Sequence, residues 1–204
     1  QNTILNIVFQ KRILPCDIVY ILINIKLNMA QFEEKKFNLT ELKGISAKNI
    51  EEHLKLYSGY VKNANLVNQK LFELWTEDAE KNTYVMNELI RRFSFEYNGM
   101  RNHEIYFDSL SGGATPLSDG PLKKALEENY GTLETFLKYF KTIAMIRGIG
   151  WAMLWFDKKE NKLLTSWVDE QHLGQLQGCA PILALDMWEH SYVADYQPSG
   201  KKQY

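Results

Sequence analysis

The spacing of apolar residues changes partway along the chain, and this change constrains the fold more than any other feature of the sequence. The helical spacing of Ile50, Leu54 and Tyr57 predicts a long helix, and Ser46 is well placed to cap its N-terminus. A second helical pattern covers roughly residues 80–110. The first half of the chain is therefore expected to form two helices joined by a turn, a helical hairpin.

The second half begins after the segment SGGATPLSDGP, whose glycine, serine and proline content predicts a connection between domains. Two shorter helices are expected at residues 121–130 and 132–146. After RGIG the apolar pattern becomes that of strands: WAMLWFD and KLLTSWVDE form a hairpin around the turn KKEN, and APILALD follows. The predicted fold class is α+β, with an N-terminal helical hairpin followed by an α/β domain that has a small three-stranded antiparallel sheet.

The chain is expected to have three parts. Residues 1–28 are rich in isoleucine, leucine and asparagine, and we interpret them as an N-terminal extension outside the domains. A targeting or anchoring segment is the alternative, although the apolar run is short for a membrane span and no small-residue cleavage site follows it. Residues 29–112 would form the helical-hairpin domain, and residues 113–204 would form the C-terminal α/β domain.

Composition excludes several classes of protein. Hydrophobic residues make up 45% of the chain and aromatic residues 13%, which is enough to build a sizeable core. A net charge of −1 predicts no binding of nucleic acid, and no membrane association is expected. The two cysteines lie far apart and predict neither a disulfide framework nor a cysteine-based zinc site, so a cytoplasmic location is expected.

Three histidines and one aspartate form a candidate metal site. Asp186 and His190 lie four residues apart in DMWEHSYV, at the end of the last predicted strand, while His53 and His103 lie on the two predicted long helices. If they converge, three imidazoles and one carboxylate suit iron, manganese, zinc or cobalt. Each residue could equally be a helix cap or an ordinary core or surface residue, so spacing by itself leaves the choice open.

Four segments, in the right order, resemble the iron/manganese superoxide dismutase family between about Phe37 and Tyr204. DMWEHSYV is similar to the Asp-x-Trp-Glu-His-Ala-Tyr signature, and NGMRNHEIYF to the segment with the second histidine ligand. GIGWAMLWF is similar to the glycine-tryptophan segment and HLKLYSGYVKNAN to the first-ligand helix. The resemblance implies an enzyme that converts superoxide to dioxygen and hydrogen peroxide by redox cycling of one mononuclear iron or manganese. It also implies that the C-terminal domain is truncated at its end.

The resemblance further implies a role for each site residue. The metal ligands would be His53, His103, Asp186 and His190, with no cofactor beyond the metal. The other active-site residues would be Tyr60 at the gateway, Gln171 as an amide near the metal, and Trp151 and Trp188 lining the pocket. Glu189 would bridge to a ligand histidine of the partner subunit, in a homodimer or a tetramer of dimers.

The sequence departs from the family pattern on the first helix. The distance from His53 to Tyr60 is one residue shorter than in relatives, and losing that residue would regularise the helix by removing a π-bulge. Leu56 and Val193 stand where many relatives have a histidine and a tyrosine that hydrogen-bond across the subunit interface. That cross-interface link is therefore expected to be absent.

The identity of the metal and two other functions stay open. Gly99 replaces the glutamine that iron-type relatives have four positions before the second ligand, and Gln171 lies about where manganese-type relatives supply one. Together they favour manganese, although His172 could take this place if the loop register shifts by one residue. The alternatives are a non-catalytic superoxide-dismutase-like interaction protein and another mononuclear metal enzyme, such as a hydrolase.

Overall fold

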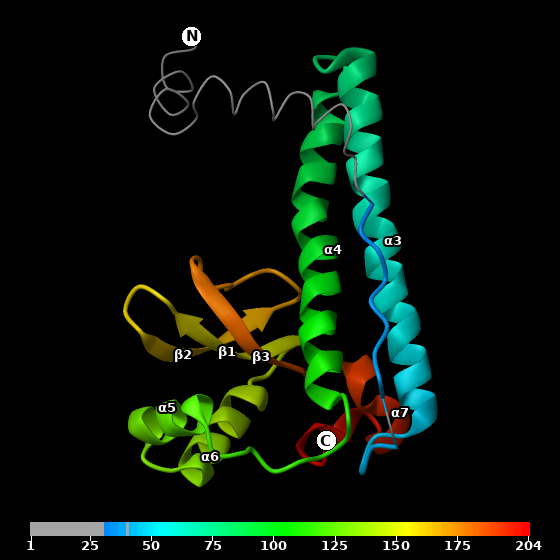
Figure 1. Ribbon diagram of the computed structural model, residues 1–204. Helices are drawn as coiled ribbons and strands as arrows, with labels where there is room; N and C mark the ends of the chain where they lie inside the picture. Colours follow the sequence, from blue (N-terminus) through cyan, green and yellow to red (C-terminus); the bar gives the residue numbers. More distant parts are fainter. Residues whose placement is uncertain (1–30, 40) are drawn as a thin grey trace. The chain divides into compact units, whose positions relative to one another are not determined.

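The computed structural model describes residues 31–39 and 41–204, and the predicted extension at residues 1–28 lies outside them. Residues 33–204 form one unit, which Figure 1 shows as a ribbon. The boundary between two domains inside this unit remains a prediction. Of the helices that the structure describes, none is both long enough and apolar enough to cross a membrane.

Two long helices form the predicted hairpin. Helix α3 (Ala47–Asp78) and helix α4 (Thr83–Leu110) lie side by side along most of their length (Figure 1). Ser46 caps α3 as predicted, because its side-chain oxygen accepts a hydrogen bond from the backbone N–H of Asn49 at 3.1 Å. The two helices therefore face each other through one row of side chains each. The candidate ligands His53 and His103 belong to these rows.

The segment that precedes α3 packs on the hairpin. The backbone N–H of Lys35 donates a hydrogen bond to the hydroxyl of Tyr57 at 2.8 Å. The ring of Phe37 lies against the rings of Tyr57 and Phe107, with centroid distances of 5.5 and 5.1 Å. These contacts cover the hairpin near the start of α3 and the end of α4, close to where His53 and His103 lie.

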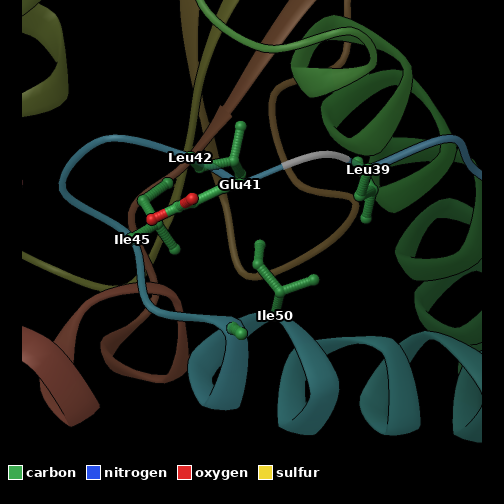
Figure 2. A pocket seen from close by; sticks show the side chains of 6 residues that line it. Leu39, Glu41, Leu42, Ile45 and Ile50 are labelled. Carbon is green, nitrogen blue, oxygen red and sulfur yellow. The ribbon is translucent and has the colours of Figure 1, made fainter.

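A small hollow lies between this segment and the first turns of α3. Figure 2 shows its lining, a mostly apolar set of side chains: Leu39, Glu41, Leu42, Ile45, Ala47 and Ile50. Its volume is about 290 Å³. Since all the lining residues belong to one stretch of chain, the hollow reflects how this stretch folds onto the start of α3.

Two short helices follow the glycine-rich connection. Helix α5 (Pro121–Tyr130) begins with a proline in its first turn, a position that proline favours because no intrahelical N–H partner is needed there. Helix α6 (Leu133–Ala144) is capped by Thr132, whose side chain accepts a hydrogen bond from the backbone of Thr135. Both helices occur where the sequence predicts them.

Within the described residues, three strands form an antiparallel sheet in the order β2-β1-β3. Strands β1 (Gly150–Asp157) and β2 (Lys162–Asp169) form the predicted hairpin. Strand β3 (Cys179–Asp186) pairs with the other edge of β1, so that Trp151 and Asp186 are direct neighbours. The α+β fold class is confirmed.

The sheet buries side chains on both faces, and this positions the site. On one face, Leu126, Phe136 and Phe140 of the short helices share a core with Ala152 and Leu154 of β1. Successive strand residues point to opposite faces, so the side chains next to Ala152 in β1 face the other way, toward the hairpin. Helix α4 packs against β3 on that side. The candidate site lies at this junction.

After β3 the chain forms short helical turns: η1 (Glu189–Ser191), α7 (Val193–Tyr196) and η2 (Pro198–Lys202). His190 therefore lies in a 3-10 turn just after the strand.

Candidate metal centre

The four predicted ligand residues meet where the hairpin packs on the sheet. His53 comes from α3, His103 from α4, Asp186 from the end of β3 and His190 from η1. One nitrogen or oxygen atom from each of them lies within 4.8 Å of the others. The side chains of His53, His103 and Asp186 are fully buried, whereas that of His190 keeps 21% of its surface exposed.

The geometry of α3 places His53 and Tyr60 on one face. Helix α3 is an uninterrupted α-helix, as expected from the shortened spacing. Seven residues correspond to about two turns, so the two side chains point in nearly the same direction. The ring of Tyr60 packs on the ring of His103 at a centroid distance of 5.0 Å. Tyr60 therefore lies beside the site even though its spacing from His53 is one residue shorter than in relatives.

Asp186 organises the turn that returns His190 to the site. The Oδ1 atom of Asp186 accepts a hydrogen bond from the backbone N–H of Trp188 at 2.8 Å, and its backbone oxygen accepts one from the hydroxyl of Ser191 at 3.0 Å. The other carboxylate oxygen, Oδ2, lies 3.1 Å from Nε2 of His190 and 3.1 Å from Nε2 of His53. One carboxylate thus both shapes the turn and faces the imidazoles.

His103 presents a nitrogen lone pair to the centre of the cluster. Its Nδ1 atom lies 2.6 Å from the backbone oxygen of Gly99, which can only accept, so Nδ1 carries the proton. Burial lowers the pKa of His103 to about 3, so the ring is neutral near pH 7 and Nε2 is unprotonated. Among the described residues, this buried Nε2 atom has no hydrogen-bond partner. It can serve as a ligand.

The charge of Asp186 also bears on whether these four residues can hold a metal ion. Burial has the largest influence and by itself raises the pKa of Asp186, but His190 and His53 together hold it below its usual value. The carboxylate oxygen Oδ2 therefore faces the lone pair of His103 Nε2 at 3.6 Å. A cation between the two atoms would remove this repulsion. Neutral imidazoles and a carboxylate suit iron and manganese, so the residues fit such an ion.

Gln171 connects the site to two aromatic residues. The indole N–H of Trp151 donates to Oε1 of Gln171 at 2.9 Å, and since an indole nitrogen can only donate, the orientation of the amide follows. The amide nitrogen of Gln171 then donates to the hydroxyl oxygen of Tyr60 at 2.9 Å. The proton of Tyr60 is therefore left free to point elsewhere.

The structure also shows which of Gln171 and His172 contacts Tyr60, a choice that the sequence leaves open. Gln171, which is fully buried, contacts Tyr60, whereas the ring of His172 lies against Phe95 at a centroid distance of 5.8 Å. The predicted pocket residue Trp188 stacks on His190 at 5.7 Å, and its indole N–H donates to the backbone oxygen of Glu170. The structure thus brings all the predicted active-site residues together.

Sequence analysis missed residues that support these contacts. The side-chain amide of Asn102 donates to the backbone oxygen of Gln171 at 3.0 Å and holds the loop against α4. Arg92 forms an ion pair with Glu96 at 2.6 Å on the same helix. The spacing of four residues between these two opposite charges was a readable signal for the pair, whereas nothing local marks Asn102.

The fold and the site together define the class of protein: an α+β architecture with a candidate site for one metal ion. Residues 118–204 match the family described as iron/manganese superoxide dismutases, C-terminal domain. The sequence is 37% identical to an iron superoxide dismutase of Cupriavidus metallidurans, over 76% of this chain and 78% of that protein. It is 35% identical to a mitochondrial manganese superoxide dismutase of Glossina morsitans morsitans, over 72% of this chain and 68% of that protein. The chain belongs to the iron/manganese superoxide dismutase family.

Proposed function

We propose that the chain is a superoxide dismutase whose single iron or manganese ion is held by His53, His103, Asp186 and His190. The observation that carries the proposal is the convergence of one donor atom from each residue to within 4.8 Å. Relatives of 32–37% identity that are named superoxide dismutases support it. The proposed location is the cytoplasm, on the basis of the two separated cysteines.

The reaction requires both electrons and protons. Two superoxide anions and two protons give one dioxygen and one hydrogen peroxide. A bound iron or manganese ion would supply a centre that alternates between the 3+ and 2+ states. The protein must then hold protons next to the substrate that is reduced, and general acid groups are the usual means.

Tyr60 and Gln171 are the proposed proton-holding pair. Burial raises the pKa of Tyr60 above its usual value, so its hydroxyl keeps its proton near pH 7. Because this hydroxyl accepts a hydrogen bond from Gln171, its own proton is available for donation. Trp151 fixes the amide of Gln171 from the other side. We propose that this chain of contacts orients a proton toward the substrate.

Manganese is the proposed metal in the organism that makes this chain. Gly99 supplies no amide from α4, and Gln171 supplies one from the loop that follows β2. Relatives named for iron and relatives named for manganese both match the sequence, so the proposal depends on the position of the amide. Metal analysis of the protein purified from its own host tests it, and iron at full stoichiometry would contradict it.

We also propose a homodimer, either alone or paired into a tetramer of dimers. Glu189 is exposed and borders a hollow of about 430 Å³, whose other lining residues include Met145, Ile146 and Ile149. These apolar side chains are 40–45% exposed. His190, the next residue in the chain, is partly exposed. Its ring could therefore donate a hydrogen bond to Glu189 of a second copy. Such a contact would occur twice across a two-fold axis.

Replacing Asp186 by asparagine tests the proposed function. This change keeps the shape of the side chain but removes the negative charge that faces the imidazoles, so the protein should retain its fold and lose its metal and its superoxide dismutase activity. The control is Asp119→Asn, since Asp119 is 93% exposed and pairs with Lys123 on α5. Metal content, circular dichroism and superoxide removal are measured for both. Full metal content with normal activity in the Asp186 variant would refute the assignment.

A further inference from the structure

The residues in and around the ligand cluster differ in how deeply they are buried. The deepest residues are at most 1% exposed: His53, His103, Trp151, Gln171 and Asp186. Tyr60 and Trp188 are only half-buried, and their rings pack on those of His103 and His190, at centroid distances of 5.0 and 5.7 Å. These two rings form a less covered side of the cluster, so a small anion from solvent can approach on this side.

Phe95 lies next to this approach. It belongs to α4, about two turns before His103. Its ring contacts Tyr60 at a centroid distance of 6.0 Å and Trp188 at 6.5 Å. Phe95 is itself half-buried, so it forms part of the rim that an incoming anion passes.

A guanidinium group sits on the face of this ring. The central carbon of the Arg92 guanidinium lies 4.1 Å from the centroid of Phe95, a distance typical of a cation–π contact. Its Nε donates to Oε1 of Glu96 at 2.6 Å. The side chain of Glu96 is 4% exposed, whereas that of Arg92 is 55% exposed. The acid is thus covered, and the positive group faces solvent at the rim.

The charges around the rim affect how strongly the site attracts or repels an anion. Glu170 is exposed and adjoins the site, because its backbone oxygen accepts a hydrogen bond from the indole of Trp188. Its negative charge repels an anion. Arg92 offsets the charge of Glu96, and because the guanidinium is exposed while the acid is covered, the positive end of this pair faces the rim. Oriented charge at the mouth of a site raises the association rate of a charged substrate.

We propose that Arg92, whose guanidinium group lies over Phe95, attracts superoxide to the rim of the site. The inference rests on the proposed function, since the substrate must be an anion. Arg92 contacts neither the ligand residues nor Tyr60 in any hydrogen bond or ring contact that the described residues show. Its effect is therefore on the rate of encounter and on the affinity for anions, not on the retention of metal.

Four proteins that differ in charge at this rim test the proposal: the wild type, Arg92→Gln, Glu96→Gln and the double variant. The bimolecular rate constant for superoxide removal should fall about threefold in Arg92→Gln at low ionic strength and rise in Glu96→Gln. The double variant keeps the net charge of the wild type but lacks the exposed guanidinium, so its rate should lie between those of Arg92→Gln and the wild type. Arg92→Lys keeps the charge and should retain most of the rate.

Salt separates an electrostatic effect from a structural one. The Debye length falls from about 30 Å at 0.01 M to about 3 Å at 1 M ionic strength. The rate differences among the four proteins should therefore shrink as salt is added. A purely structural defect in a variant would persist at every ionic strength. The affinity of the metal-loaded proteins for azide, a small anion, should follow the same order as the rates.

The neighbouring ion pair supplies a matched control. Arg91 and Glu88 form a pair at 3.2 Å on the same helix, and their side chains are 73% and 57% exposed. Arg91→Gln changes the net charge of the chain as Arg92→Gln does, but within the described part of the chain it is the guanidinium of Arg92, not that of Arg91, that lies over Phe95. Its rate and azide affinity should equal those of the wild type.

The outcomes separate this inference from the proposed function. A metal-loaded wild type without superoxide dismutase activity would refute the proposed function. An active wild type with equal rates in all four proteins would overturn the role of Arg92, as would an equal loss in Arg91→Gln and Arg92→Gln. If Arg92→Gln loses metal or stability, Glu96→Gln and Arg92→Lys decide: a Glu96→Gln rate no higher than that of the wild type overturns the proposal.

Discussion

Replacing Gly99 by alanine should move Tyr60 away from Gln171. A β-carbon at position 99 would lie 2.5 Å from Cδ1 and 2.7 Å from Cε1 of the Tyr60 ring, far inside normal contact distance. The ring also packs on His103, at a centroid distance of 5.0 Å, so it has little space to yield without moving its hydroxyl. The hydrogen bond of 2.9 Å from Gln171 to Tyr60 should then be lost.

The size of the effect follows from these contacts. Overpacking of this kind costs about 1–3 kcal/mol. The buried amide N–H of Gln171, left without its partner, costs about 1–3 kcal/mol more. Alanine inside a helix regains about 0.5–1 kcal/mol relative to glycine. The free energy of unfolding should therefore fall by about 1–5.5 kcal/mol, which lowers the melting temperature of a chain of this size by about 2–22 °C.

Calorimetry of the metal-loaded variant, with metal content and superoxide removal, measures both consequences. Metal content should stay near that of the wild type because the ligands are unchanged, while activity should fall with the displacement of the Tyr60 hydroxyl. The control is Gly59→Ala, one residue before Tyr60 on α3, where a β-carbon would meet nothing within 4 Å. That variant should be stabilised by about 0.5–1 kcal/mol. A Gly99 variant with wild-type stability and activity would refute this reasoning.

Other perturbations test neighbouring contacts. Trp151→Phe removes the indole N–H that holds Gln171, and chemical unfolding should show a loss of about 1–3 kcal/mol; no loss would mean that this bond contributes little. Glu189→Ala should shift the protein toward monomer in sedimentation, and an unchanged dimer would contradict the proposed bridge. Burial lowers the pKa of His103 from its usual 6.5 to about 3, so below pH 6.5 the unfolded chain binds a proton that the folded chain does not. Stability should then fall between pH 6.5 and 3 by up to about 1.4 kcal/mol per pH unit, and a constant melting temperature over that range would contradict this.

The sequence by itself determined the secondary structure and the chemistry of the site, because both are written in short-range patterns. Helical spacing and the cap at Ser46 predicted the hairpin, and turn residues between alternating apolar runs predicted β1 and β2. Asp186 and His190 lie four positions apart in one segment, so their spacing is readable. The family resemblance then associated this segment with His53 and His103.

The face that α3 buries was decided by tertiary structure. The apolar spacing that predicted α3 includes Ile50 and Leu54, but both are half-buried, whereas the polar residues Asn49 and His53 are 1% exposed. Burying a polar group costs free energy unless it is hydrogen-bonded, and the partners here are distant in sequence. Asn49 donates to the backbone oxygen of Ser191, 142 residues away, at 3.0 Å.

The choice between Gln171 and His172, and the position of the Arg92 guanidinium, also came from tertiary structure. A loop has no repeating pattern, so a shift of one residue leaves no trace in the sequence. Asn102 and Trp151 hold Gln171 in place from two other elements. Likewise, the spacing of Arg92 and Glu96 indicates an ion pair on a helix, but only the packing of Phe95 against Tyr60 and Trp188 places that pair beside the candidate metal centre.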